Sequence, residues 1–192
     1  MKRVGKLVVN VGSMFSGKSS ELLRQGRRYE LMGKRVLFVK PSRDKRYSES
    51  EIVTHDKQAI PSISVRNANQ LRDKILFRYK ELDALLIDEV QFFDELLIPY
   101  ITEFIYFREV DVIVSGLDMD RFGVPFGIVP QLMAIADEVH KFKAICGDCG
   151  NDAYISHGEF DGSNQVVLGA KEKYTPLCRA CYFEKTIKRR YA

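Results

Sequence analysis

The chain has 192 residues, of which 45% are hydrophobic and 29% are charged, and its formal net charge is +4. This length allows one hydrophobic core with a small appendage and excludes two large domains, and the composition is that of an ordinary globular protein. Much of the basic excess lies at the C-terminus, where a solvated tail is a commoner explanation than a nucleic-acid contact. We therefore expect no nucleic-acid partner.

The N-terminus leads into an apolar run without the pattern of a signal peptide, and no run in the chain is long enough to cross a bilayer. We therefore expect no membrane partner and a cytoplasmic protein. Residues 6–11 are the first predicted strand. From 18 to 32 the apolar residues follow a helical period, in which Leu22, Leu23 and Leu31 could face a core.

A second strand, a loop, a helix and a third strand are predicted in the middle of the chain. The strand at 35–40 is followed by a polar stretch, 42–57, whose lack of a sustained period predicts a loop. Asn67, with a glutamine three residues later, is the expected N-cap of a helix that reaches about Tyr79. Residues 84–90 then form a strand that passes from apolar into acidic residues.

The same alternation continues towards the C-terminus. A helix is predicted at 96–107, a strand at 111–117, a glycine- and proline-rich loop at 118–127 and a short helix at 131–136. Strands that alternate with helices indicate a parallel sheet covered on both faces. The predicted class of the larger part of the chain is therefore α/β.

A phosphate-binding motif, G-x-x-x-x-G-K-[ST], lies between the first predicted strand and the first predicted helix. Its residues are Gly12, Ser13, Met14, Phe15, Ser16, Gly17, Lys18 and Ser19. Glycines let the backbone turn its N–H groups around phosphates, and the helix that follows adds the positive end of its dipole. Lys18 should reach the β- and γ-phosphates of ATP, and Ser19 should bind Mg²⁺. A chance match is disfavoured by the strand before the motif and the helix after it.

Asp88 and Glu89 stand at the carboxyl end of a predicted strand, where α/β sheets place their ligands. We assign Asp88 to the hydrated Mg²⁺ and Gln91 to the same ATP and magnesium site. Glu89 would orient a water in an ATPase or accept the proton of an acceptor hydroxyl in a kinase. The alternative is that Glu89 only caps the end of the strand in water.

The four cysteines form two C-x-x-C pairs, Cys146 with Cys149 and Cys178 with Cys181. In a reducing compartment two such pairs favour one tetrahedral zinc over disulfides, and four thiolates leave no open position, so the zinc would be structural. A redox dithiol is the alternative, but it explains one pair and not two. Residues 150–177 separate the pairs by more than the usual spacing, which predicts a long excursion. We place the domain boundary between 1–143 and 144–192.

With these motifs together, the chain resembles the thymidine kinase family that bacteria, animals and poxviruses share. The resemblance spans nearly the whole chain and rests on GSMFSGKS at 12–19, DKRY at 44–47, THD at 54–56, DEVQFF at 88–93, LD at 117–118, PFG at 125–127 and the cysteine pairs with KY at 173–174 and CYF at 181–183. It implies a P-loop (RecA-like), mostly parallel sheet with flanking helices and a small C-terminal zinc-ribbon or lasso domain.

The resemblance also implies a reaction, transfer of the γ-phosphate of ATP to the 5′-hydroxyl of thymidine or deoxyuridine in pyrimidine salvage. By similarity Glu89 is the general base, and Asp44 and Arg46 lie close to the phosphates. Arg46 and Lys18 would be catalytic through the charge that they offer to the moving phosphoryl group. Taken alone, Asp44 and Arg46 would be a surface charge pair. The family further implies a homotetramer and feedback inhibition by thymidine triphosphate.

A nucleoside site follows from the same resemblance. The backbone of the lasso segment would bond the edge of the base, at Gln165, Val166, Val167, Leu168 and Gly169. Tyr174 would position the nucleoside. Apolar walls could come from Met14, Phe92, Leu117 and Phe126, each of which, taken singly, is more often ordinary core.

Two departures from the family pattern affect this site. Many bacterial relatives have Asp-Phe-Arg-Gly where this chain has Asp-Arg-Phe-Gly at 120–123. The aromatic residue expected to stack on the base is therefore either Phe122, one place later, or missing. His157 stands where relatives often carry an arginine.

Two other classes of protein compete with the kinase. A nucleic-acid ATPase is permitted by the basic tail, but the chain is short for it and the cysteine segment is not especially basic. A non-catalytic nucleotide sensor should have lost Glu89. Both classes are disfavoured by the sequence.

Overall fold

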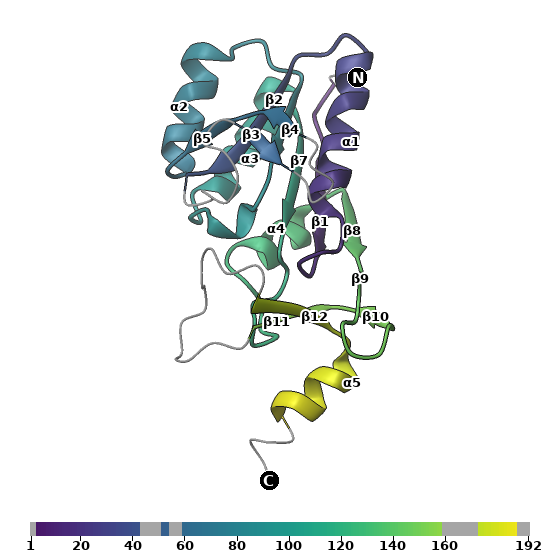
Figure 1. Ribbon diagram of the computed structural model, residues 1–192. Helices are drawn as coiled ribbons and strands as arrows, with labels where there is room; N and C mark the ends of the chain where they lie inside the picture. Colours follow the sequence, from purple (N-terminus) through teal and green to yellow (C-terminus); the bar gives the residue numbers. More distant parts are fainter. Residues whose placement is uncertain (1–2, 43–50, 54–58, 159–172, 188–192) are drawn as a thin grey trace.

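The computed structural model describes residues 3–42, 51–53, 59–158 and 173–187. A larger α/β part carries the main sheet, and a smaller part with β9 to β12 and α5 lies beyond the carboxyl ends of the strands (Figure 1). No helix of the described residues is long and apolar enough to cross a membrane.

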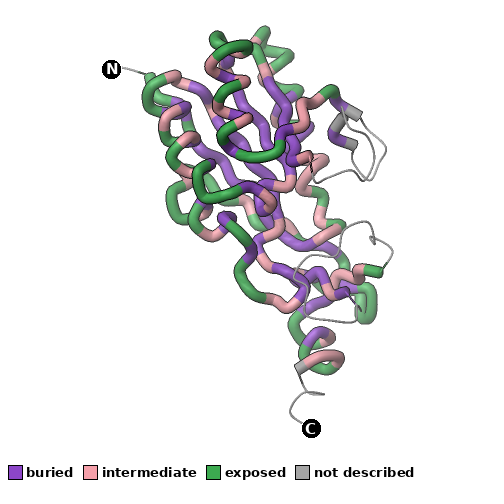
Figure 2. The backbone as a smooth tube through the Cα atoms, turned by 90° about the vertical axis from the view of Figure 1, so that its left-hand side faces the viewer, coloured by how far each residue is buried: buried purple, intermediate pink, exposed green. Residues whose placement is uncertain are grey.

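The main sheet has six strands, and every neighbouring pair in it is parallel. In spatial order the strands are β5 (Ile63–Val65), β2 (Val36–Pro41), β6 (Ala84–Ile87), β7 (Asp111–Gly116), β1 (Leu7–Gly12) and β8 (Glu138–Phe142). The interior strands β1, β6 and β7 are buried nearly throughout, which explains their continuous apolar runs (Figure 2).

Helices cover both faces of the sheet, as predicted. They are α1 (Lys18–Leu31), α2 (Ala68–Arg78), α3 (Leu97–Arg108) and α4 (Val129–Ile135). Successive residues of a strand point to opposite faces, so Val9 of β1 joins the core under α2, α3 and α4, while Val8 joins the core under α1. The predicted α/β class with its flanked parallel sheet is confirmed.

Helix α1 packs closely on the sheet through a glycine, and one leucine prediction is wrong. A Cβ atom on Gly26 would lie 2.2 Å from the ring of Phe38, so the helix can approach the sheet only without a side chain there. Leu22 and Leu23 are buried as expected, but Leu31 is 87% exposed. Leu31 follows Leu22 by nine residues, about two and a half helical turns, and therefore lies on the opposite face of the helix.

The structure also corrects the strand predictions. Strand β8 was not predicted because it is an edge strand with mostly exposed or half-buried side chains. Strands β3 (Glu51–Val53) and β4 (Ala59–Pro61) form a small antiparallel pair, so the loop predicted at 42–57 is wrong over β3. The strand predicted at 84–90 ends at Ile87, because the chain then turns into the short 3₁₀ helix η1 (Val90–Phe92).

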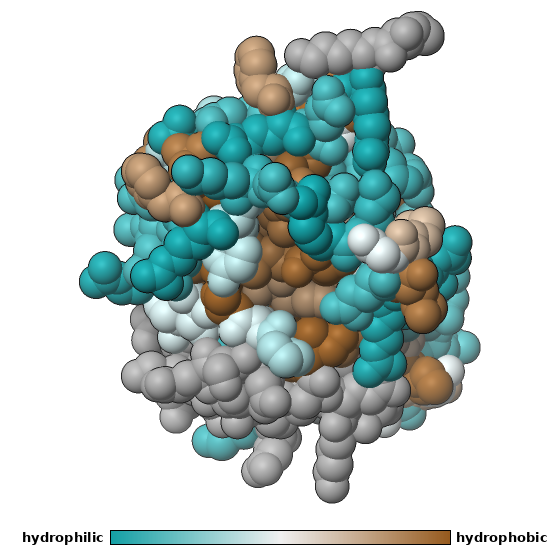
Figure 3. Space-filling model, turned by 90° about the horizontal axis from the view of Figure 1, so that it is seen from above, coloured by the Kyte–Doolittle hydropathy of each residue, from teal (hydrophilic) through white to brown (hydrophobic). Residues whose placement is uncertain are grey.

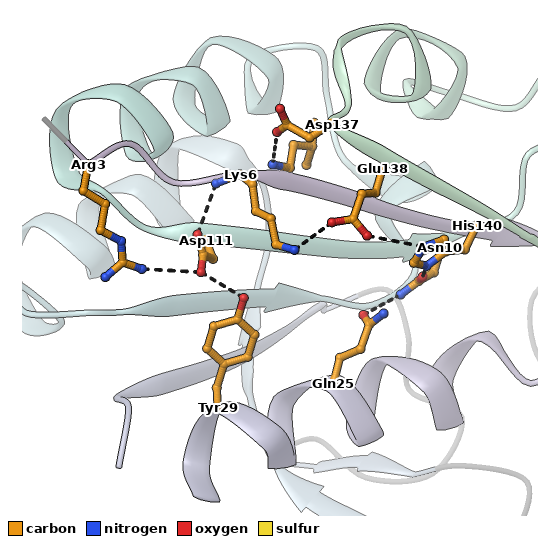
Figure 4. Close-up of polar contacts among 10 residues, drawn as sticks. Arg3, Lys6, Asn10, Gln25, Tyr29, Asp111, Asp137, Glu138 and His140 are labelled. Atoms are coloured by element: carbon orange, nitrogen blue, oxygen red, sulfur yellow. Dashed lines mark hydrogen bonds and ion pairs between the residues drawn. The ribbon is translucent and has the colours of Figure 1, made fainter. Parts of the chain in front are cut away.

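Polar side chains connect α1, β1, β7 and β8 away from the phosphate loop (Figure 4). The hydroxyl of Tyr29 donates to Asp111 at 2.9 Å, and the ammonium of Lys6 bonds Glu138 at 2.7 Å. The two bonds connect α1 to the start of β7, and the start of β1 to the start of β8. At the surface, the end of the molecule away from α5 is mostly hydrophilic around a central group of hydrophobic residues (Figure 3).

The C-terminal part consists of two short antiparallel strand pairs and a helical end. Strand β9 (Ala144–Ile145) pairs with β10 (Asp152–Ala153), and β11 (Ile155–Gly158) pairs with β12 (Tyr174–Leu177). The chain continues into α5 (Arg179–Tyr182) and η3 (Phe183–Ile187). A small separate core is formed by Ala144, Cys146, Ala153, Ile155, Leu177, Cys178 and Tyr182.

Candidate active site and metal centre

The phosphate loop turns sharply between β1 and α1. Gly12, Phe15 and Gly17 all have positive φ, at 144°, 64° and 83°, so the turn depends on two glycines and one residue in the left-handed region. The loop packs against the end of β8 at Gly12. A Cβ atom there would lie only 2.3 Å from the carbonyl oxygen of Phe142. The ammonium of Lys18 donates to the carbonyl oxygen of Ser13 at 2.6 Å and so lies over the loop.

The loop meets the acidic end of β6 directly. The hydroxyl of Ser19 donates to the carboxylate of Asp88 at 2.9 Å, although 69 positions separate them in the sequence. The other oxygen of Asp88 accepts the N–H of Glu89 at 3.0 Å, and the side chain is only 7% exposed. A hydroxyl and a buried carboxylate in contact at the carboxyl edge of a parallel sheet are the groups that a P-loop protein uses for Mg²⁺.

Glu89 occupies a strained backbone position beside this pair. Its φ of 52° and ψ of 42° place a non-glycine residue in the left-handed region, which costs about 1–3 kcal/mol and is typical of functional sites. The side-chain amide of Gln91 donates to the carboxylate of Glu89, and its oxygen accepts the N–H of Leu117 at 3.1 Å. Gln91 is therefore engaged at both ends and orients the carboxylate of Glu89.

The expected nucleoside walls are partly brought together. The rings of Phe92 and Phe126 meet edge to face, with centroids 5.9 Å apart, and Phe126 is 6% exposed. A Cβ atom on Gly127 would lie 2.5 Å from the carbonyl oxygen of Gln91, so the loop after β7 packs directly on the turn after β6. Three other expected residues are half-buried, namely Met14, Leu117 and Tyr174.

The loop after β7 carries a buried arginine that the sequence did not single out. The carboxylate of Asp120 accepts the N–H groups of Phe122 at 2.8 Å and Val124 at 3.2 Å, which fixes the turn. The guanidinium of Arg121 lies 4.3 Å from the centre of the Phe122 ring and donates to the carbonyl oxygen of Gly158 at 3.4 Å. Arg121 is 7% exposed, and one face of the Phe122 ring is therefore against a cation.

The four cysteines converge, and their sulfur atoms all lie within 4.8 Å of one another. A tetrahedron with metal–sulfur bonds of about 2.3 Å has edges of about 3.8 Å, and the sulfur atoms of Cys149 and Cys178 are 3.6 Å apart. Burial opposes ionisation of Cys146, but the backbone N–H groups of Cys178 and Cys149 lower the pKa of its thiol to about 6. Neighbouring thiols, Cys149 first among them, raise the pKa of Cys181. This donor set fits a metal ion that prefers sulfur.

Comparison with known proteins identifies the family. A model of the thymidine kinase family matches residues 5–182. The chain belongs to the thymidine kinase family. A thymidine kinase of Bacteroides fragilis is 45% identical over 181 residues, which is 94% of this chain and 88% of the relative. A thymidine kinase of Porphyromonas gingivalis is 44% identical over 180 residues, 94% of this chain and 86% of the relative.

Among solved structures, AMPPCP-bound DnaA from Aquifex aeolicus matches 73% of this chain at 16% identity, with a TM-score of 0.40. The chain spans 41% of the length of that protein. The family match confirms two predictions made from the motifs, the thymidine kinase family and a kinase enzyme. A kinase that uses ATP requires a divalent cation, and the cysteine cluster could hold a metal ion.

Several predicted site residues lie outside the described part of the chain. They are Asp44, Arg46, Gln165, Val166, Val167, Leu168 and Gly169. The structure describes the remaining ones.

Proposed function

We propose that this chain transfers the γ-phosphate of ATP to the 5′-hydroxyl of thymidine or deoxyuridine. The observation that carries the proposal is the contact between Ser19 and Asp88 with Glu89 directly beside it. A triphosphate held by Gly12–Ser19 would present its γ-phosphate at the end of β6. Membership of the thymidine kinase family indicates that the acceptor is a nucleoside.

In this reaction Glu89 accepts the proton of the 5′-hydroxyl while the oxygen bonds to the γ-phosphorus. The bond between that phosphorus and the bridging oxygen of the β-phosphate breaks, and ADP leaves. Lys18 offers positive charge to the β- and γ-phosphates. Ser19 and Asp88 would hold Mg²⁺, which neutralises charge on the phosphates when it is bound. Asp44 and Arg46 are proposed beside the phosphates by family resemblance.

Gln91 takes part through Glu89 and not through ATP. Both ends of its amide are engaged, by Glu89 and by the N–H of Leu117, so we propose a positioning role in place of the expected contact with ATP or magnesium. The hydrogen bond from Gln91 restricts the directions that the carboxylate of Glu89 can take. Gln91 thereby links the base to the loop that follows β7.

For the nucleoside we propose apolar walls formed by Met14, Phe92, Leu117 and Phe126, supported by the contact between the two rings. Tyr174 positions the sugar, and Phe122 stacks on the base with Arg121 on its other face. The backbone of 165–169 would bond the edge of the base.

We propose that the cysteine cluster holds one structural zinc, since four sulfur donors favour zinc and leave no open position. The proposed domains are residues 1–143 and 144–192, supported by the separate small core of the C-terminal part. Family membership further supports a cytoplasmic homotetramer inhibited by thymidine triphosphate.

The test is label transfer from [γ-³²P]ATP to each of five nucleosides: thymidine, deoxyuridine, deoxycytidine, deoxyadenosine and deoxyguanosine. The proposal predicts a labelled monophosphate with thymidine and deoxyuridine, in a reaction that needs Mg²⁺. Hydrolysis of ATP that DNA stimulates, without label on any nucleoside, would support a nucleic-acid ATPase and overturn the proposal.

A further inference from the structure

The first half of the phosphate loop contacts the C-terminal part of the chain at two consecutive residues. The N–H of Met14 donates to the hydroxyl of Ser156 at 2.8 Å, and the hydroxyl of Ser13 lies 3.5 Å from the carbonyl oxygen of Ala153. A distance of 2.8 Å is a good hydrogen bond, whereas 3.5 Å is at the limit of one. The bond from the loop to Ser156 of β11 is therefore stronger than its contact with Ala153 of β10.

Ser156 faces the phosphate loop because of its place in the strand. On one side of β11, Ile155 packs into the cysteine-cluster core, and the ring of His157 lies 5.9 Å from the ring of Tyr182. Side chains of a strand alternate between its two faces, so Ser156 points to the other side, where it is 2% exposed. A hydroxyl at this buried place satisfies the N–H of Met14, which would otherwise lose its partner.

The cysteine cluster fixes the position of Ser156 through the backbone. Ser156 pairs with Pro176 in β12, and Cys178 follows directly after that strand. The N–H of Gly147, inside the first cysteine pair, donates to the carbonyl oxygen of Pro176 at 2.9 Å. Both cysteine pairs therefore hold the strand that pairs with β11.

We propose that Ser156 is a positioning residue for the phosphate loop, and that through it the cysteine cluster supports the binding of ATP. The proposal rests on the proposed function in one respect, that ATP binds at Gly12–Ser19. By holding the N–H of Met14, the hydroxyl keeps the loop in one conformation before the phosphates arrive, which lowers the cost of ordering it on binding. The affinity for ATP then depends on a residue outside the loop.

The test compares Ser156→Ala with Ser156→Thr, which keeps the hydroxyl, and with Ser62→Ala as a matched control. The hydroxyl of Ser62 makes no hydrogen bond among the described residues, and Ser62 precedes β5, at the opposite edge of the sheet from β8. Calorimetry gives the Kd of ATP with Mg²⁺ and without nucleoside, and amide exchange by NMR reports on Met14.

We expect Ser156→Ala to raise the Kd about tenfold and to speed exchange at Met14, with both values near wild type in Ser156→Thr and Ser62→Ala. A Kd for Ser156→Ala within twofold of wild type, with unchanged exchange, would overturn the proposal. The Kd is measured without turnover, so it does not depend on the kinase reaction. If Ser156→Ala raised the Kd of ATP while the wild-type chain labelled no nucleoside, this proposal would stand and the kinase reaction would be refuted.

A second experiment tests the route through the cysteine cluster. Cys149→Ser, which removes one sulfur ligand, should also raise the Kd of ATP and speed exchange at Met14. Two changes that act through the same contact do not have additive effects. The double variant, Cys149→Ser with Ser156→Ala, should therefore bind ATP about as weakly as whichever single variant has the higher Kd. Fully multiplicative effects on the Kd would show that the two sites act independently, and would refute the relay through Ser156.

Discussion

Replacing Gln91 by methionine tests how the general base is held. Methionine has nearly the same length and suits a side chain that is 4% exposed, but it makes neither of the two hydrogen bonds of the amide. A hydrogen bond to a charged group contributes about 1.5–3 kcal/mol, and about 1.4 kcal/mol corresponds to a tenfold change in rate. Gln91→Met should therefore lower kcat roughly 10- to 100-fold, because Glu89 loses the hydrogen bond from Gln91.

The same change leaves the N–H of Leu117 without its acceptor, which should cost about 1–3 kcal/mol of unfolding free energy and lower Tm by several degrees. Steady-state kinetics at saturating thymidine give kcat and the KM for ATP. Thermal unfolding gives Tm, and calorimetry gives the affinity for ATP. The KM for ATP should change less than threefold, since both ends of the Gln91 amide are engaged by Glu89 and Leu117. Gln131→Met, at an exposed position on α4, is the matched control.

A kcat for Gln91→Met within threefold of wild type would refute the positioning role of Gln91. A large rise in the KM for ATP with an unchanged kcat would instead support the original expectation that Gln91 contacts ATP or magnesium.

Three further predictions concern the rest of the molecule. Cys149→Ser should lower bound zinc, measured by atomic absorption, from about one ion per chain to a small fraction, and should speed proteolysis between Cys149 and Cys178; full zinc content would contradict the assigned centre. Arg121→Met should raise the KM for thymidine about tenfold, with the KM for ATP unchanged; equal changes in both would argue for a general loss of structure. Hydrogen bonds from the N–H of Arg35 and from Lys34 lower the pKa of Asp83 to about 2 from an ordinary 3.8, so its ionised form stabilises the fold above about pH 4 and this contribution is lost as pH falls towards 2. Asp83→Asn should therefore lower the unfolding free energy by about 1–2 kcal/mol at pH 7, and urea titrations should show the gap closing between pH 4 and pH 2; a gap that does not change with pH would refute this.

The sequence predicted the site best where chemistry depends on local order along the chain. The glycine turn between a strand and a helix required only spacing, and the structure shows it at Gly12–Ser19. The meeting of Ser19 with Asp88 followed from a general property of parallel sheets, whose strands bring their carboxyl ends to one edge. The cysteine cluster likewise followed from the C-x-x-C spacing within each of the two cysteine pairs.

The sequence did not predict features that depend on tertiary contact. Arginine is usually exposed, so nothing in the sequence marked Arg121 as buried against Phe122 and β11. The role of Gln91 depends on its hydrogen bonds to the carboxylate of Glu89 and to the N–H of Leu117, which lies 26 positions away in the sequence. Ser156 is one serine among many until the register of β11 turns it towards the phosphate loop.

Edge strand β8 was missed for a different reason. Its side chains are exposed or half-buried, and it includes Lys141 and His140, so it lacks the apolar run that marks the interior strands. Its pairing with β1 depends on the backbone and on the contact at Gly12, where a side chain would meet the carbonyl oxygen of Phe142.

The central claim is that Glu89 activates a nucleoside hydroxyl opposite a triphosphate held by the phosphate loop. Single-turnover transfer from [γ-³²P]ATP to thymidine, measured by rapid quench for wild type and Glu89→Gln at saturating nucleotide, tests it most directly. The account predicts labelled thymidine monophosphate from the wild-type chain and a rate at least about 10²-fold lower for Glu89→Gln, with the Kd of ATP unchanged. Transfer by Glu89→Gln at the wild-type rate, or no label on thymidine with either protein, would contradict it.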